Sequence, residues 1–160
     1  MTSRSGPRDD DRPGWRGPRI AGNPSGSRIV SALVDTNVLV RHLTGDPPSQ
    51  ARRATAFLRA SHELVLPDLI LAELVYVLES FYERPRGEVA VAARALLAFP
   101  SVNVVDRDLL LRALEHYESS HLDFADAYLA AAAELWKVDR VASFDRALDR
   151  ITSVERIEPS

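Results

Sequence analysis

The sequence contains no cysteine, which excludes disulfide bonds, thiolate zinc sites and cysteine nucleophiles. Glycine is scarce where a phosphate-binding loop would need it, because five of the seven glycines lie within residues 1–26 and only Gly45 and Gly87 follow. A P-loop or a dinucleotide-binding motif needs clustered glycines directly after a strand, so neither is present. No apolar run reaches the length of a transmembrane helix, and the N-terminus lacks the apolar stretch of a signal peptide. We therefore expect a cytoplasmic protein that does not enter a membrane.

Lysine is almost absent too, since Lys137 is the only one and arginine carries the remaining positive charge. Of the 20 basic and 23 acidic residues, residues 1–28 hold six arginines and three aspartates. Residues 29–160 are left with 14 basic and 20 acidic residues, a net charge of −6. Such an acidic body argues against a protein that wraps duplex nucleic acid or lies on a membrane surface, because both need an excess of basic residues.

Composition divides the chain into two regions. Residues 1–28 contain five glycines, four prolines and four serines and almost nothing that a core could bury, so we predict a disordered leader. Residues 29–160 are predicted to form one domain, because 160 residues leave little room for two cores.

From Ile29 onward, short apolar runs alternate with longer amphipathic segments. We predict strands over 29–34, 63–66, 102–105 and 141–143, with an edge strand over 154–157. We predict helices over 36–43, 48–60, 69–81, 87–99, 107–119 and 123–137, and a helical turn over 144–150. Strands that alternate with helices are typical of the α/β class. We expect a short, mostly parallel central sheet of four to five strands, covered by helices on both faces.

For two of the predicted helices, the spacing of apolar residues indicates which side chains face the core. In residues 48–60, the inward side chains are expected to be Ala51, Ala54, Phe57 and Leu58. In residues 69–81, the inward stripe is expected to be Leu69, Ile70, Leu74, Val77, Leu78 and Phe81, with Glu73 inside it. A buried carboxylate costs several kcal/mol unless it is paired or bound to a metal. Glu73 therefore either binds a cation or pairs with a buried arginine.

Three further acids are candidates: Asp35 and Asp145 directly follow predicted strands, and Asp126 lies in the first turn of an apolar predicted helix. Each also has a purely structural explanation. Asp35 could cap the helix that follows it, Asp126 could form a capping box with Asp123, and Asp145 could lie solvated in a first turn capped by Ser143.

The positions of these acids also suit a ligand site, because ligands of open α/β sheets gather beyond the carboxyl ends of the strands. If the strands are parallel neighbours, all four acids can converge at one edge of the sheet. Clustered carboxylates repel one another unless a cation neutralises them. Oxygen ligands without cysteine or paired histidines select Mg²⁺ or Mn²⁺ over zinc, and such an ion is suited to phosphodiester hydrolysis.

Four strings resemble, in order and spacing, the acidic motifs of PIN-domain ribonucleases, and most closely those of VapC-type toxins from bacterial toxin–antitoxin pairs. They are VDTNVLVRHL, LILAELVYVLES, LDFADAYLAAAA and VASFDRAL, all within residues 29–157. The resemblance implies catalytic and metal-binding roles for Asp35, Glu73, Asp126 and Asp145, with Asp35 and Asp126 as the foremost direct ligands. It implies accessory roles for Asn37, which would brace Asp35, and for Asp123 and Ser143.

The activity implied by the resemblance is that of an endoribonuclease that hydrolyses RNA phosphodiester bonds with one or two Mg²⁺ ions, or with Mn²⁺. It also implies a homodimer and a cognate antitoxin protein as partners. Two alternatives stay open: a housekeeping RNA-processing nuclease, and a catalytically silent RNA-binding module on the same fold. The presence of all four acids favours an enzyme over the silent module.

Arginine side chains are the candidate contacts to RNA, because guanidinium groups bind phosphate through two parallel hydrogen bonds. The candidates are Arg41, Arg52, Arg53, Arg84 and Arg86. A second surface is expected at Tyr76, Phe81 and Tyr82, which add more aromatic area than one small core can absorb and so suggest a protein partner.

Overall fold

The computed structural model describes residues 32–61 and 63–160. The predicted leader (residues 1–28) and the first residues of the first predicted strand (residues 29–31) lie outside this part of the chain. The order of the elements is β1 (Ala32–Leu33), α1 (Thr36–Thr44), α2 (Pro48–Ala60), β2 (Leu64–Val65), α3 (Asp68–Ser80), α4 (Arg86–Leu97), β3 (Val102–Asn103), α5 (Arg107–Ser119), α6 (Phe124–Leu135), β4 (Arg140–Ala142), the 3₁₀ helix η2 (Arg146–Arg150) and β5 (Glu155–Ile157). The α/β class is confirmed.

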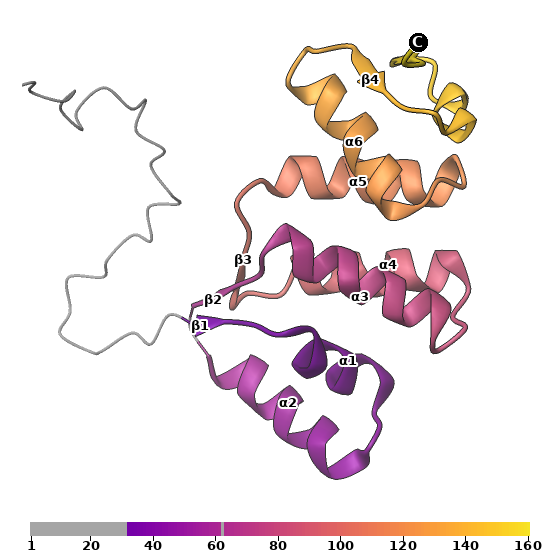
Figure 1. Cartoon of the computed structure of the whole chain (residues 1–160). Coiled ribbons are helices and arrows are strands. Elements are labelled where there is room, and N and C mark those ends of the chain that lie inside the picture. Colours follow the sequence, from indigo (N-terminus) through magenta and orange to yellow (C-terminus); the bar gives the residue numbers. More distant parts are fainter. Residues whose placement is uncertain (1–31, 62) are drawn as a thin grey trace, which may run out of the picture.

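The helices stack as antiparallel pairs, α1 with α2, α3 with α4, and α5 with α6, and the short strands β1 to β3 lie along one side of the stack, at the left in Figure 1. Proline and glycine set several of the turns. Pro48 is the first residue of α2, and Pro67 and Pro85 directly precede α3 and α4. Helix α1 ends at Gly45, whose φ of 76° lies in the left-handed region that glycine adopts without strain.

All strand pairs within the described residues are parallel, but they form two sheets instead of one. Strands β1, β2 and β3 form the first sheet in that order, and β4 pairs with β5 in the second. The predicted parallel strands are confirmed, and the structure divides the five described strands between two sheets. The sequence shows where apolar runs occur, but not which run pairs with which.

The three-stranded sheet has one buried face. Leu64 and Val102 are buried and lie in register with the half-buried Ala32. On the opposite face, Leu33 is 74% exposed. Its register partner Val65 is half-buried, and Asn103, the register partner of Val65 on β3, is exposed. Within the described chain, one face of this sheet is thus buried more deeply than the other.

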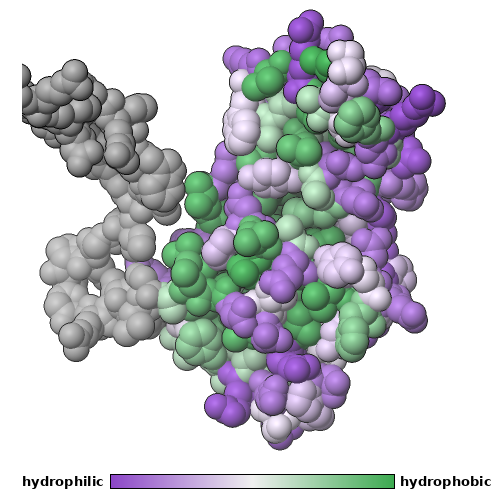
Figure 2. All heavy atoms as spheres, in the orientation of Figure 1, coloured by the Kyte–Doolittle hydropathy of each residue, from purple (hydrophilic) through white to green (hydrophobic). Residues whose placement is uncertain are grey.

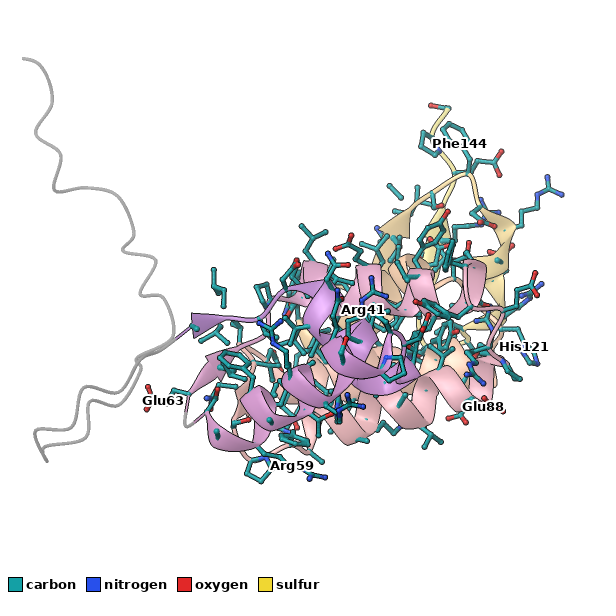
Figure 3. The ribbon with its side chains drawn as sticks, turned by 90° about the horizontal axis from the view of Figure 1, so that it is seen from below. Arg41, Arg59, Glu63, Glu88, His121 and Phe144 are labelled. Carbon is teal, nitrogen blue, oxygen red and sulfur yellow. The ribbon has the colours of Figure 1, made fainter. Side chains whose placement is uncertain are left out.

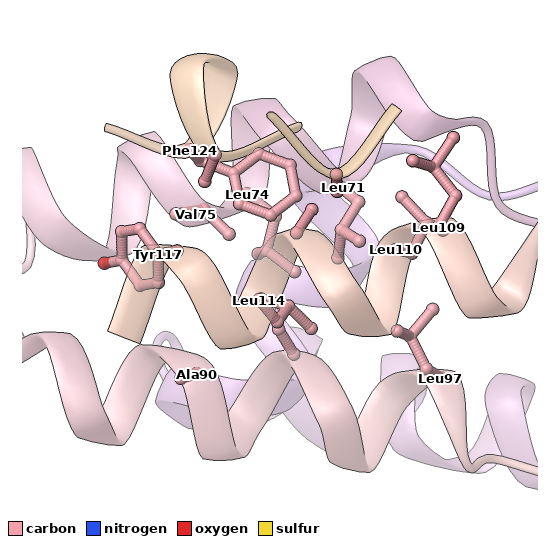
Figure 4. Packing of buried hydrophobic residues seen from close by; sticks show 14 of the residues in the cluster. Leu71, Leu74, Val75, Ala90, Leu97, Leu109, Leu110, Leu114, Tyr117 and Phe124 are labelled. Atoms are coloured by element: carbon pink, nitrogen blue, oxygen red, sulfur yellow. The ribbon is translucent and has the colours of Figure 1, made fainter. Parts of the chain in front are cut away.

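The core extends from the buried face of the sheet into the space between the helices. Leu71, Leu74 and Val75 of α3 pack with Leu110 and Leu114 of α5 inside the buried cluster, which Figure 4 shows at close range. Burying each leucine side chain of this kind contributes about 1.5–3 kcal/mol. The core therefore fixes α3 against α5 and α6. Two of these helices carry predicted acidic motifs, α3 with Glu73 and α6 with Asp126.

A polar network at Glu134 of α6 holds the C-terminal segment in place. Its carboxylate accepts hydrogen bonds from Arg112 Nε (2.6 Å) and from the Ser153 hydroxyl, and pairs with His116 Nε2 at 3.1 Å. Burial acts to raise the pKa of Glu134, but these hydrogen bonds outweigh burial and lower the pKa to about 2. The charged network thereby ties the loop before β5 to α5 and α6.

None of the described helices is long and apolar enough to span a membrane.

Candidate active site

Asp35 lies at the junction between β1 and α1, where it is exposed. It occupies the N-cap position of α1, yet its side chain makes no capping hydrogen bond, so the structural alternative of a helix cap is not realised. Instead, Asn37 Nδ2 donates to Asp35 Oδ2 at 3.2 Å. Among the described residues, no hydrogen-bond donor is found for the second carboxylate oxygen of Asp35.

Glu73 lies on α3 and faces the same junction. Its Oε2 accepts a hydrogen bond of 2.5 Å from the hydroxyl of Thr36, the residue directly after Asp35. Thr36 itself is buried, so its hydroxyl has a fixed position from which to orient the carboxylate. The first two acidic motifs therefore meet through Thr36. Sequence reasoning missed Thr36, although its place in the string Asp35-Thr36-Asn37 was a usable signal.

The prediction that Glu73 lies within the buried stripe is wrong. The buried side of α3 consists of Leu71, Leu74, Val75 and Leu78, and Glu73 is exposed. Leu69 and Phe81 were also expected to face inward and are 77% and 76% exposed. Almost every residue of this helix is apolar, so periodicity alone does not fix the rotation of the helix about its axis. No buried arginine pairs with Glu73 within the described chain, and its polar partner is Thr36.

Asp126 on α6 and Asp145 before η2 lie in direct contact, although 18 residues separate them in the sequence. Burial raises the pKa of Asp126, and the neighbouring carboxylates of Asp145 and Asp123 and a hydrogen bond with Asp145 raise it further. Asp123 is the N-cap residue of α6, but its side chain makes no capping hydrogen bond. The structure thus shows no capping box, the structural alternative for Asp126.

Asp145 has a structural role as well. Its Oδ1 accepts a hydrogen bond of 2.8 Å from the backbone N–H of Ala147 and so caps η2. The Ser143 hydroxyl in turn accepts a hydrogen bond of 2.9 Å from the backbone N–H of Asp145. These two bonds fix the position of the Asp145 side chain beside Asp126.

Glu73 and Asp126 lie on neighbouring helices, α3 and α6. Tyr128 of α6 donates a hydrogen bond of 2.8 Å to Asp68 Oδ2 at the start of α3. Glu73 lies five residues further along α3, and Asp126 lies two residues before Tyr128 on α6. Helices α3 and α6, which carry Glu73 and Asp126, are therefore in direct contact.

All the acidic side chains at this junction offer carboxylate oxygens, the donor type that hard divalent cations prefer. The contact between Asp126 and Asp145 is also one that a cation would relieve. The chemistry of the donors therefore fits such an ion. Within residues 32–61 and 63–160, however, no three Asp, Glu or His side chains are grouped closely enough to hold a metal ion.

A hollow of about 390 Å³ opens beside Glu73. Thr36, Asn37 and Arg41 of α1 line one side of it, and Glu73 and Tyr82 line another. A larger hollow of about 630 Å³ lies between α1 and α2, and Asn37 and Arg41 line that one too. The two hollows therefore adjoin along α1.

The five arginines predicted to bind RNA differ in their surroundings. Arg86 is engaged within the fold, where it pairs with Glu79 and donates to the carbonyl oxygens of Tyr117 and Leu122. Its guanidinium also lies 4.2 Å from the centre of the Tyr117 ring. We therefore replace the predicted RNA contact of Arg86 with a structural role, because its donors are already used. Arg84 is exposed and lies 3.8 Å from Glu88.

The family model for the PIN domain matches residues 32–154 of the chain. The chain belongs to the PIN-domain family. A curated relative, the VapC ribonuclease of Aquifex aeolicus (strain VF5), is 25% identical over 122 residues, which cover 74% of this chain and 90% of that protein. The resemblance predicted from the sequence is confirmed. In this PIN domain, all four acids of the predicted motifs lie within the matched residues.

Proposed function

We propose that this PIN domain is an endoribonuclease that hydrolyses RNA phosphodiester bonds with Mg²⁺, or with Mn²⁺ in its place, and that it acts as the toxin of a toxin–antitoxin pair. The observation that carries the proposal is the position of Asp145 beside Asp126, which hydrogen bonds with Ser143 and Ala147 maintain. The similarity to a VapC ribonuclease over most of both chains supports the choice of RNA.

Asp35 and Asp126 are the proposed direct ligands of the ion, and Glu73 and Asp145 complete the set. A bound divalent cation would supply a Lewis acid that lowers the pKa of water and offsets charge on the leaving oxygen. Neighbouring residues hold two of these carboxylates in position through hydrogen bonds. Thr36 orients the Glu73 carboxylate, and Asn37 holds one oxygen of Asp35.

Asp126 holds its proton more tightly than an ordinary aspartate, because it is half-buried beside two other acids that raise its pKa. Positive charge at this position would favour the ionised form, so binding of a cation is expected to release the proton. The Ser143 and Ala147 contacts keep Asp145 close to Asp126 during this change.

The proposal includes a cytoplasmic location, a cognate antitoxin and a homodimer. Exposed aromatic side chains near the C-terminal end of α3 support a protein partner, since Tyr76 is 69% and Phe81 76% exposed. Figure 2 shows further apolar side chains open to solvent on one face, interspersed with hydrophilic ones.

The test is cleavage of RNA by the purified full-length chain. We expect discrete new RNA ends in the presence of Mg²⁺ or Mn²⁺ and none when EDTA removes the ion. The Asp126→Asn variant, purified in the same way, excludes a contaminating nuclease and should leave the RNA intact. Cleavage that continues in EDTA, or that the Asp126→Asn preparation performs equally well, would contradict the proposal.

A further inference from the structure

The groove between α1 and α2 is the largest hollow among those described next to the candidate active site, with a volume of about 630 Å³. Its walls are Arg41 and Val38 on α1 and Arg53 and Phe57 on α2. It adjoins the smaller hollow at Glu73, because Asn37 and Arg41 line both. A chain that lies in the groove can therefore continue directly towards Glu73.

Among the described residues, no carboxylate forms an ion pair with the arginines of the groove. Arg41 donates to the neutral backbone carbonyl of Asp46 at 3.0 Å, and within the described chain neither Arg41 nor Arg53 forms an ion pair. Arg52 precedes Arg53 in the sequence but does not line the groove. Figure 3 shows Arg41 on α1 and, well apart from it, Arg59 near the end of α2. Arg41 and Arg53 thus form a local cationic pair on a body of net negative charge.

Phe57 supplies an aromatic surface beside this pair. It was expected to face the core, but the buried stripe of α2 consists of Ala51, Ala54 and Leu58, and Phe57 is 47% exposed. Residues 51, 54 and 58 follow the helical period, and Phe57 lies at the edge of their stripe. An exposed ring next to guanidinium groups is the combination with which proteins bind unpaired bases and their phosphates.

We propose that the α1–α2 groove binds a single-stranded segment of the RNA substrate, with phosphates on Arg41 and Arg53 and a base stacked on Phe57. This inference rests on the proposed function and assigns a path to its substrate. A wholly apolar protein helix suits the groove less well, because it would cover Arg41 and Arg53 without neutralising them. Duplex RNA is also a poor fit, since its paired bases are not free to stack on a side chain.

The experiment measures binding of a short fluorescein-labelled single-stranded RNA of mixed sequence to the full-length chain by fluorescence anisotropy in EDTA. Without a divalent cation no cleavage is expected, so binding is observed separately from catalysis. We expect Phe57→Leu to weaken binding about tenfold, since stacking one base on an aromatic ring contributes about 1–3 kcal/mol. We expect Arg53→Gln to weaken binding. The slope of log Kd against log salt concentration should fall by about one, the amount that corresponds to one lost phosphate contact.

Arg59→Gln is the matched control, because it removes the same charge from an exposed position of the same helix, outside the groove. It should bind RNA much as the wild type does. Equal effects of Arg59→Gln and Arg53→Gln, or no effect of Phe57→Leu, would overturn the proposal and leave the groove to a protein partner. If the wild type cleaves RNA while Phe57→Leu and Arg53→Gln bind it normally, the groove assignment fails and the nuclease function stands. If the wild type binds RNA through the groove but never cleaves it, the nuclease function fails instead.

Discussion

The Asp35→Asn variant is expected to cleave RNA about 10²–10³ times more slowly than the wild type while it keeps its fold. The large effect follows because metal-ion catalysis supplies several kcal/mol of transition-state stabilisation, and each 1.36 kcal/mol corresponds to a factor of ten in rate. Stability should change little, because the Asp35 carboxylate is exposed and does not cap α1. The amide oxygen of asparagine can still accept the hydrogen bond from Asn37. The measurement is the initial rate of cleavage in Mg²⁺, with a thermal melt of the same sample.

Asp139→Asn provides the matched control for this loss of one negative charge. Asp139 is exposed and has a φ of 60°, a backbone conformation that asparagine tolerates well. It lies outside all four acidic motifs, so its variant should cleave RNA at the wild-type rate. Undiminished cleavage by Asp35→Asn would refute the role given to Asp35.

The Arg86→Met variant is expected to lose about 2–4 kcal/mol of unfolding free energy. Arg86 joins three helices, because it pairs with Glu79 of α3 at 3.1 Å and donates to the Tyr117 carbonyl oxygen of α5 at 2.8 Å from its own position on α4. It also donates to the carbonyl oxygen of Leu122, just before Asp123. Each hydrogen bond to a charged group contributes about 1.5–3 kcal/mol, although such values do not add fully. The stacking on Tyr117 adds about 0.5–2 kcal/mol.

Urea denaturation of both proteins measures this difference. Arg84→Met is the control, because Arg84 lies two residues away and its pair with Glu88 is long and exposed. Such a pair contributes about 0–1 kcal/mol, so the control should unfold close to the wild type. Equal stability of the Arg86→Met and Arg84→Met variants would show that Arg86 does not join the helices. Arg86 would then again be a candidate contact to RNA.

Sequence reasoning located the elements of this fold well and their pairing poorly. The helices of residues 48–60 and 107–119 begin and end where predicted, because proline starts α2 and the Asp106 side chain caps α5. The strands were harder, because a short apolar run does not identify its neighbour in the sheet. The division into two sheets depends on hydrogen bonds between distant segments, such as Val141 with Arg156.

At the candidate site, too, the sequence identified the residues but not the contacts between them. The spacing of the acidic motifs singled out Asp35, Glu73, Asp126 and Asp145, and the structure brings Asp126 and Asp145 into contact. The rotation of α3 was not accessible from the sequence, because Glu73 interrupts a helix that is apolar on nearly every side. The hydrogen bond from Thr36 to Glu73 joins residues 37 positions apart, and local periodicity carries no information about such contacts.

Arg86 and Phe57 illustrate a further limit. The type of residue suggested phosphate binding for Arg86 and burial for Phe57, and both side chains do otherwise. Arginine serves equally well as a surface cation and as an internal donor of several hydrogen bonds, so only its neighbours decide between these roles.

The central claim is that the Asp35–Glu73 pair and the Asp126–Asp145 pair bind the same ion. Titration of Mn²⁺ into the wild type, Asp35→Asn and Asp126→Asn, followed by the electron paramagnetic resonance signal of free Mn²⁺, tests it without reference to RNA. The account predicts that both variants lose the tightest-bound ion of the wild type, with an affinity at least about tenfold lower. An ion that Asp126→Asn loses and Asp35→Asn binds as tightly as the wild type would contradict a shared site.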